Sequence, residues 1–252
     1  MQEQVADLVA DPVGIAGGTG GSVVFADDRG SATFSGISTY TGSTTIAAGT
    51  WALTGAGSIA ASSGLTDNGI FDIAGTSAGA SIAGLGGGGA VTLGSQTLTL
   101  SDAHDSFAGI IGGSGGLVLA DGRQVLNGVN TYAGLTELRG GTLLVGDAAH
   151  ASAAIVSDTQ VDSGATLGGH GRIDGDVALQ SGGHLAPGGS IGTLSIGGNL
   201  GAASGSVLDY EFGAPGADLH TFGAGDSVQV DGDLTLNGAV LNVVDAGGMG
   251  AG

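Results

Sequence analysis

From Gly14 onward, apolar and polar residues alternate in short runs of three to six residues. SVQV from Ser227 and DLTL from Asp233 are typical, because every second residue is a Val or Leu and the residues between are polar. Such alternation is expected of strands with one buried and one exposed face. Glycines and Asn-Gly or Asp-Gly pairs separate the runs. The pattern therefore predicts an all-β protein of many short strands.

The Asn-Gly and Asp-Gly pairs mark corners where we expect a positive φ angle. They occur at Asn68-Gly69, Asp121-Gly122, Asn127-Gly128, Asp174-Gly175, Asp231-Gly232 and Asn237-Gly238. In an antiparallel protein such pairs close hairpins and lead to a sandwich or barrel. In a solenoid they turn the chain from one face to the next.

An internal repeat favours the solenoid. TFSGISTYTGSTTIAAGTWALTG from Thr33 matches VLNGVNTYAGLTELRGGTLLVG from Val125, with Tyr40 on Tyr132 at an offset of 92 residues. Upstream, GSVVFADDR from Gly21 matches GGLVLADGR from Gly115 at an offset of 94. Because apolar residues stay apolar in both copies, we expect a buried face at the pairs Val23/Leu117, Phe25/Leu119, Phe34/Leu126, Ile37/Val129, Ile46/Leu138, Trp51/Leu143 and Leu53/Val145.

The predicted fold is a right-handed, single-stranded parallel β-helix, or β-solenoid, in which each strand stacks on its equivalent one coil later. With roughly 20 to 25 residues per coil, the repeat offset spans about four coils and the chain holds roughly a dozen. The 10 aromatic residues suggest an interior too narrow for many rings.

Composition supports an ordered protein with few possible partners. Glycine and proline make up 59 of 252 residues, but a hydrophobic fraction of 41% argues against disorder. The net charge is −19, and the only cations are Arg29, Arg123, Arg139 and Arg172. Scattered arginines do not form the basic patch that nucleic acids or anionic membranes require.

The termini and the absence of cysteine bear on export. No cysteine and no apolar run of about 18 residues occur, so we expect neither disulfides nor a transmembrane helix. MQEQVADLVADP is not a secretory signal, which suggests Sec-independent export or an excised fragment. Val5, Leu8 and Val9 have helical spacing before Pro12, so residues 1–13 are interpreted as a solenoid cap or a linker remnant.

Candidate chemical motifs are weak. GDSV at Gly225 is similar to a serine-hydrolase motif but lacks its context, so Asp226 and Ser227 are interpreted as the turn before a strand. The histidines lack a metal-binding spacing, and only His170 and His184 are close enough to meet on adjacent coils. They are His104, His150, His170, His184 and His220.

Three glycine-rich sequences resemble ligand-binding motifs but lack residues that those motifs require. GGHGRID at Gly168 approaches a calcium-binding nonapeptide, but Ile173 occupies the aspartate position and Asp174 comes one residue late, on the other face. GGTGGS at Gly17 and GGSGGL at Gly112 precede no helix and no lysine, so they are interpreted as turns rather than phosphate loops. We therefore predict no catalytic, cofactor-binding or metal-binding residue, no cofactor and no enzyme activity. A β-helical enzyme acting on acidic polysaccharide is disfavoured by the anionic surface, whereas one acting on neutral glycan stays open.

The repeat resembles the passenger-associated transport repeat of bacterial autotransporters, G-x-N-T-Y-x-G-x-T-x-[IL]-x-x-G-T-L. The second copy, GVNTYAGLTELRGGTLL from Gly128, keeps this pattern, and the first departs from it at Ser38 and Trp51. LAPGGSIGTLSIGGNL from Leu185, followed by GSVLDYEF and DSVQVDGDLTLNGAVLNVV, resembles the autochaperone-like end of such a passenger.

The resemblance implies residues 14–154 as a β-helix with two transport repeats, at about 21–55 and 115–146, and 155–252 as a C-terminal, autochaperone-like β-helix. It implies a non-enzymatic passenger at the cell surface, acting as stalk and folding nucleus, with a role in adhesion or virulence. Its partner would be an outer-membrane barrel of the same protein, absent from this chain. The nucleus would be formed by burial of Leu185, Ile191, Leu194, Ile196 and Leu200, with turns at Gly188, Gly189 and Gly192. The alternative is a direct adhesin that binds a host receptor, a glycan or another copy of itself.

Overall fold

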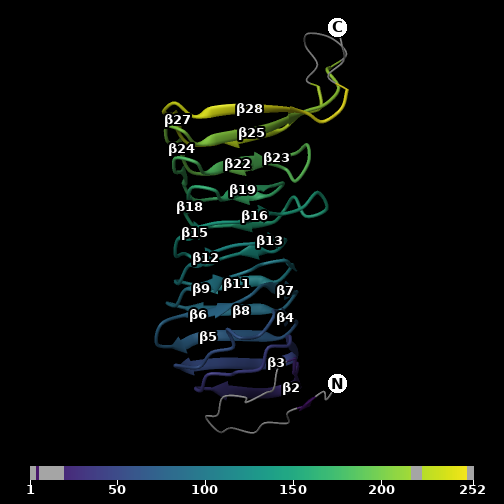
Figure 1. Cartoon of the computed structure of the whole chain (residues 1–252), viewed down its shortest axis with the longest axis vertical. Coiled ribbons are helices and arrows are strands. Elements are labelled where there is room, and N and C mark those ends of the chain that lie inside the picture. Colours follow the sequence, from purple (N-terminus) through teal and green to yellow (C-terminus); the bar gives the residue numbers. More distant parts are fainter. Residues whose placement is uncertain (1–3, 6–19, 217–222, 249–252) are drawn as a thin grey trace.

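The computed structural model describes residues 4–5, 20–216 and 223–248. The chain winds into a column of stacked turns, with β2 near one end and β28 at the other (Figure 1). All pairings between the named strands are parallel, which confirms the β-solenoid and rules out the hairpin alternative. The described residues contain no α-helix, and so no helix that could cross a membrane.

Each turn has three faces, and each face is a stack of parallel strands. The first face consists of β6 (Ala80–Ile82), β9 (Leu98–Leu100), β12 (Leu117–Leu119), β15 (Thr136–Leu138), β18 (Thr159–Val161), β21 (Val177–Leu179), β24 (Leu200–Ala202) and β27 (Leu234–Leu236). The second consists of β4 (Leu65–Asp67), β7 (Leu85–Gly87), β10 (Ser106–Phe107), β13 (Arg123–Leu126), β16 (Thr142–Val145), β19 (Thr166–Gly169), β22 (His184–Pro187), β25 (Val207–Phe212) and β28 (Val240–Asp245).

The third face consists of β5 (Ile70–Thr76), β8 (Ala90–Gly94), β11 (Ile110–Gly113), β14 (Val129–Asn130), β17 (Ala154–Ile155), β20 (Arg172–Ile173), β23 (Thr193–Ile196) and β26 (Ser227–Val230). Two long strands, β2 (Val23–Phe34) and β3 (Thr44–Gly55), continue round the corner between the second and third faces. They therefore join both stacks into one 15-stranded sheet.

The turns differ in length. Thr44 pairs with Leu65, 21 residues later, whereas Leu167 pairs with Leu185 after 18 and Leu208 with Leu241 after 33. The last turn is long because the chain leaves it after Phe212 in an antiparallel excursion closed by a bridge to Gly225. Ten successive pairings from β2 to β28 close about ten turns, near the dozen expected.

The interior is a continuous apolar core, but its composition changes along the axis. The C-terminal half stacks aliphatic side chains such as Leu143, Leu167 and Leu185 in register. The N-terminal half is aromatic, with Trp51 stacked on Phe34 at a ring distance of 4.2 Å. The interior holds more rings than the expectation of a core too narrow for many of them. Seven of the ten aromatic residues are buried: Phe25, Phe34, Tyr40, Trp51, Phe71, Phe107 and Tyr132.

The two repeat copies build the same corner with side-chain hydroxyls. The Tyr40 hydroxyl bonds Thr44 Oγ1 (2.6 Å), which donates to Ser62 Oγ of the next turn (2.8 Å). In the second copy Tyr132 bonds Thr136 Oγ1 (2.7 Å), and Thr136 bonds Ser157 of the next turn (2.6 Å). Burial raises the pKa of Tyr132 to about 12, so this hydroxyl stays protonated.

The copies nevertheless lie on different faces. Thr44 belongs to the second face in β3 and Thr136 to the first face in β15. Four full turns and two further faces separate Phe34 from Leu126, rather than the four coils expected. The motif therefore specifies a type of corner, not a particular side of the solenoid.

Among the glycines of the six dipeptides, only two have the positive φ expected of a corner. Gly122 and Gly238 have φ of 86° and 75°, but the other four glycines do not lie in this region. There, glycine is required because the backbone of the previous turn passes too close: a Cβ on Gly128 would lie 1.8 Å from the Gly109 carbonyl oxygen, and one on Gly69 would lie 2.5 Å from that of Gly49.

Two further expectations were wrong. Ile37 and Val129 are 69% and 49% exposed, although the repeat pattern predicted both to be buried. At this position the apolar residue shared by the two copies therefore does not pack in the core. Val5, expected in a helix, lies in β1 (Gln4–Val5), which pairs with β2. Leu8 and Val9 lie outside the described residues.

A carboxylate occupies the core of the N-terminal half. Asp67 is fully buried between Ile46 and Gly87 of the adjacent turns. Its Oδ1 accepts a hydrogen bond from the Gly69 N–H (3.0 Å), but Oδ2 has no partner. Burial raises the pKa of Asp67 from 3.8 to about 6, despite backbone hydrogen bonds that oppose the shift.

The Asp67→Asn variant is expected to stabilise the protein at neutral pH. Because the folded-state pKa of Asp67 is raised, the stability due to its protonated form is complete below its ordinary pKa and is lost as pH rises through about 6. The gap in unfolding free energy between variant and parent should grow over this range to about 3 kcal/mol, at about 1.4 kcal/mol per pKa unit. Urea unfolding at several pH values measures it, and a gap independent of pH would contradict the assignment.

Candidate functional site

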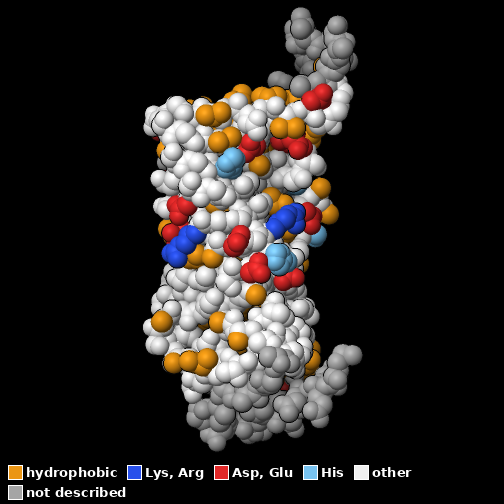
Figure 2. Space-filling view, viewed as in Figure 1, with side chains coloured by type: hydrophobic (Ala, Val, Ile, Leu, Met, Phe, Trp, Pro, Cys, Tyr) orange, Lys and Arg blue, Asp and Glu red, His pale blue; other side chains and the backbone are white. Residues whose placement is uncertain are grey.

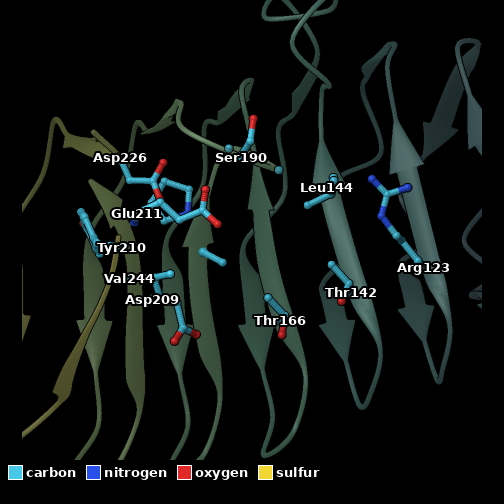
Figure 3. A pocket seen from close by; sticks show the side chains of 14 residues that line it. Arg123, Thr142, Leu144, Thr166, Ser190, Asp209, Tyr210, Glu211, Asp226 and Val244 are labelled. Atoms are coloured by element: carbon cyan, nitrogen blue, oxygen red, sulfur yellow. Dashed lines mark hydrogen bonds between the residues drawn. The ribbon is translucent and has the colours of Figure 1, made fainter. Parts of the chain in front are cut away.

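A groove lies on the second face, near the C-terminal end. It has a volume of about 270 Å³ and runs across strands β13 to β28 (Figure 3). Arg123 lies at one end and the carboxylates of Asp209 and Glu211 at the other. Its remaining lining consists of the Asp226 carboxylate and of hydroxyl, small and apolar residues: Thr142, Leu144, Thr166, Ala186, Pro187, Gly188, Gly189, Ser190, Tyr210 and Val244.

An arch formed by residues 187–192 covers part of this groove. Gly188, with φ of 75°, bends the arch back so that it pairs with Gly169 in an antiparallel bridge. Asp226 fixes its far end, because Oδ1 accepts from the Gly192 N–H (2.9 Å) and Oδ2 from the Glu211 N–H (2.7 Å). The GDSV motif thus places Asp226 as a buried structural brace immediately before β26, as the turn interpretation expected.

Some charged side chains in the groove have hydrogen-bonding partners and others have no ion-pair partner. Asp209 is held from both sides, by the His184 ring (Nδ1 to Oδ2, 2.6 Å) and by the Asn242 amide (2.7 Å). Arg123 forms no ion pair among the described residues, and the Glu211 carboxylate forms none there either. Charged and histidine side chains gather over the middle and upper part of the face seen in Figure 2.

Polar side chains also connect successive C-terminal turns outside the groove. The Arg172 guanidinium bonds Asp174 of its own turn and reaches Asp231 at 2.9 Å. It crosses the intervening turn at Gly197, where a Cβ would lie 2.5 Å from the guanidinium nitrogen. The absence of a side chain at Gly197 therefore permits this long contact.

A second series of contacts follows the corner between the third and first faces. Asp158 Oδ1 accepts from the Asp176 N–H (2.9 Å), Asp176 Oδ1 from the Asn199 N–H (2.7 Å) and Asn199 Oδ1 from the Asp233 N–H (2.8 Å). These residues are in register one turn apart. We call this series the Asx ladder.

The other sequence candidates are dispersed. His104 and His150 contact the exposed Asp102 and Asp147 of their own turns, at 2.9 and 2.6 Å. His170 lies against Gly192, whereas His184 contacts Asp209; His220 lies outside the described residues. Within the described ranges, no three His, Asp or Glu side chains are grouped as metal ligands.

The glycine-rich motifs have structural positions. In GGHGRID, Ile173 is buried and Asp174 is exposed beside Arg172. In GGSGGL, the turn continues β11 into the corner before β12, and a Cβ on Gly115 would lie 1.8 Å from the Gln96 oxygen. GGTGGS begins outside the described residues. The groove and the Asx ladder were not predicted from sequence, because turns of unequal length hide their spacing.

Comparisons with known proteins show similarity to a repeat family and to an autotransporter adhesin. Residues 29–53 and 121–145 each match the passenger-associated-transport-repeat family. A stretch of 155 residues, 58% of the chain, is 35% identical to the adhesin BmaC autotransporter of Brucella suis biovar 1 (strain 1330). The chain covers only 4% of that relative's length. No solved structure matches.

The matched repeats coincide with the two hydroxyl-linked corners at Tyr40 and Tyr132, so the same residues carry both the similarity and the geometry. The two repeats and the similarity over 58% of the chain therefore support a bacterial autotransporter passenger domain, a kind of region displayed at the cell surface.

Proposed function

We propose that this segment is a non-enzymatic β-helical stalk and that residues 155–252 act as the folding nucleus during export. In this proposal residues 14–154 form the repeat-bearing part of the stalk, preceded by a cap or linker at 1–13. The partner is the outer-membrane barrel of the same protein, through which the chain passes unfolded.

The contacts between C-terminal turns are the observation that supports a nucleus there. The Arg172 contact, the Asx ladder and the His184, Asp209 and Asn242 series each add side-chain bonds between turns to the backbone bonds. Individually, exposed ion pairs contribute only up to about 1 kcal/mol. Several such side-chain contacts in adjacent turns together favour a block of turns that folds before the rest of the chain.

The core of this block matches the proposed nucleus. Leu185, Leu194 and Ile196 are fully buried and Leu200 nearly so. Ile191 is only half-buried beside Gly213, so it contributes less than proposed from sequence. Once these residues are buried, each new turn stacks on a formed edge and need not close a distant contact. The folding free energy would then favour outward movement of the chain.

Replacement of Leu194 and Ile196 by Asp in a fusion of this chain to an outer-membrane barrel should reduce surface display about tenfold or more, since two buried charges destabilise the block by several kcal/mol. Ser195→Asp, on the solvent-facing side of the same strand, is the matched control and should leave display intact. Protease accessibility on whole cells measures the exported fraction. Normal display of the double variant would refute the nucleus.

A direct adhesin is the second candidate function. It is supported by the groove on the second face, in which Arg123 and Glu211 have charged groups free to contact a ligand. It is further supported by the relative, which is named an adhesin. In this case the arch and groove would form the contact surface for a host receptor, a glycan or another copy.

Ala186→Arg, which fills the groove, should abolish attachment by cells that display the protein. Ala178→Arg, on the exposed side of the first face, is the matched control. Attachment to host cells and cell-cell aggregation are measured for the parent and both variants. No attachment by the parent, or equal attachment by all three, would contradict the adhesin candidate and leave the stalk as the better account.

A further inference from the structure

The chain contains three Asn-Gly sequences, at Asn68, Asn127 and Asn237. Such a pair can react with itself: the glycine backbone nitrogen loses its proton and attacks the asparagine Cγ, and ammonia leaves to give a cyclic imide. Water then opens the ring at either carbonyl and gives aspartate or isoaspartate. The reaction requires a free backbone nitrogen, a mobile side-chain amide and room for the two to meet.

Asn68 lacks the first requirement. The Gly69 N–H is held by Asp67 Oδ1 at 3.0 Å, and Asn68 Oδ1 accepts from the Gly88 N–H at 3.2 Å. Gly69 also lies close to the previous turn, where the Gly49 carbonyl oxygen blocks the space beside it. Attack would therefore break contacts that belong to the core around Asp67.

Asn127 lacks the second requirement. Its amide donates to Ser106 Oγ (3.0 Å) and Asp147 Oδ2 (2.9 Å), while its Oδ1 accepts from the Asp147 N–H (3.0 Å). Gly128 is packed against the Gly109 carbonyl oxygen. The amide is thus fixed between two turns and cannot rotate towards the Gly128 nitrogen.

Asn237 meets all three requirements. It lies at the corner between β27 and β28, is exposed, and its side chain forms no hydrogen bond among the described residues. The Gly238 N–H does not donate to the ladder, and the nearest atom to a Cβ built there is Ser204 Oγ at 3.3 Å. Gly238 also has a positive φ, a conformation that glycine adopts without steric cost.

These properties belong to the corner and not merely to the last turn. The equivalent residues of the preceding turns are Asp162, Gln180 and Ala203, and each is at least partly exposed. The backbone N–H groups that follow them, in Ser163, Ser181 and Ser204, are also outside the ladder.

We propose that Asn237 is a site of spontaneous deamidation in the folded protein, where water replaces the side-chain amide nitrogen. The aspartate product adds a negative charge at this corner. The isoaspartate product inserts a methylene into the main chain between β27 and β28. It thereby strains the neighbouring bonds from the Gly205 N–H to Gly238 O (3.2 Å) and from the Val240 N–H to Ser206 O (2.8 Å).

The test is to incubate the folded protein in mildly alkaline buffer and to quantify deamidation at each asparagine by peptide mass spectrometry, with isoaspartyl methyltransferase labelling. Asn237 should react about tenfold faster than Asn68 and Asn127, which corresponds to about 1.4 kcal/mol of activation free energy. In concentrated urea the three rates should become similar, because all three asparagines precede glycine. Equal rates in the folded protein, or faster reaction at Asn68 or Asn127, would overturn the proposal.

Two variants provide matched controls. Asn237→Gln should remove most of the acidic species that accumulates on charge-sensitive chromatography. Asp147→Ala removes one hydrogen-bond acceptor of the Asn127 amide. It should accelerate deamidation at Asn127 and leave the Asn237 rate unchanged. Undiminished accumulation of the acidic species in Asn237→Gln would also overturn the assignment.

Discussion

The fold depends on parallel hydrogen bonding between the backbone of each turn and that of the next. This ladder brings equivalent residues of successive turns to the spacing of neighbouring strands, about 4.8 Å. Every inward position must therefore pack on the same position one turn away, as Leu143, Leu167 and Leu185 do. The same closeness excludes a side chain wherever two corners meet, as at Gly128 above Gly109. Many of the glycines follow from this single constraint.

The solenoid was predictable because the constraint leaves a clear pattern of short alternating runs, frequent glycine and an internal repeat. The rotation of the two repeats was not predictable, because the turns between them are 19 to 21 residues long and four such turns fall short of 92 residues. Sequence comparison aligns similar corners and carries no record of the face on which each corner lies. The exposed Ile37 and Val129 show the same limit, since apolar identity alone cannot tell an inward from an outward position.

Local irregularities were also beyond prediction. Asp105 is exposed where the register would place an inward residue, and Gln124 of the next turn fills the gap. Its amide donates to Leu85 O at 2.8 Å and accepts from the Leu85 N–H at 3.3 Å, across two turns. A glutamine in an alternating strand does not reveal from sequence that its amide bonds the backbone two turns away. The groove has a similar origin, because the arch that covers it depends on long-range contacts of Asp226.

The two halves of the molecule are stabilised differently. The N-terminal half has a large aromatic core that also encloses Asp67, an ionisable group that weakens it at neutral pH. The C-terminal half has a smaller aliphatic core and several polar connections between its turns. The proposed nucleus requires the C-terminal turns to be the more stable block, which would give the column a direction. Such an order suits a chain whose C-terminal part folds first.

Hydrogen exchange along the whole chain at neutral pH, in moderate urea, tests this directional stability most directly. The account predicts that the amides of β19 to β25 remain protected longest and that those of β4 and β5, around Asp67, exchange first. Equal protection throughout the column, or earlier exchange in β19 to β25 than in β4 and β5, would contradict it.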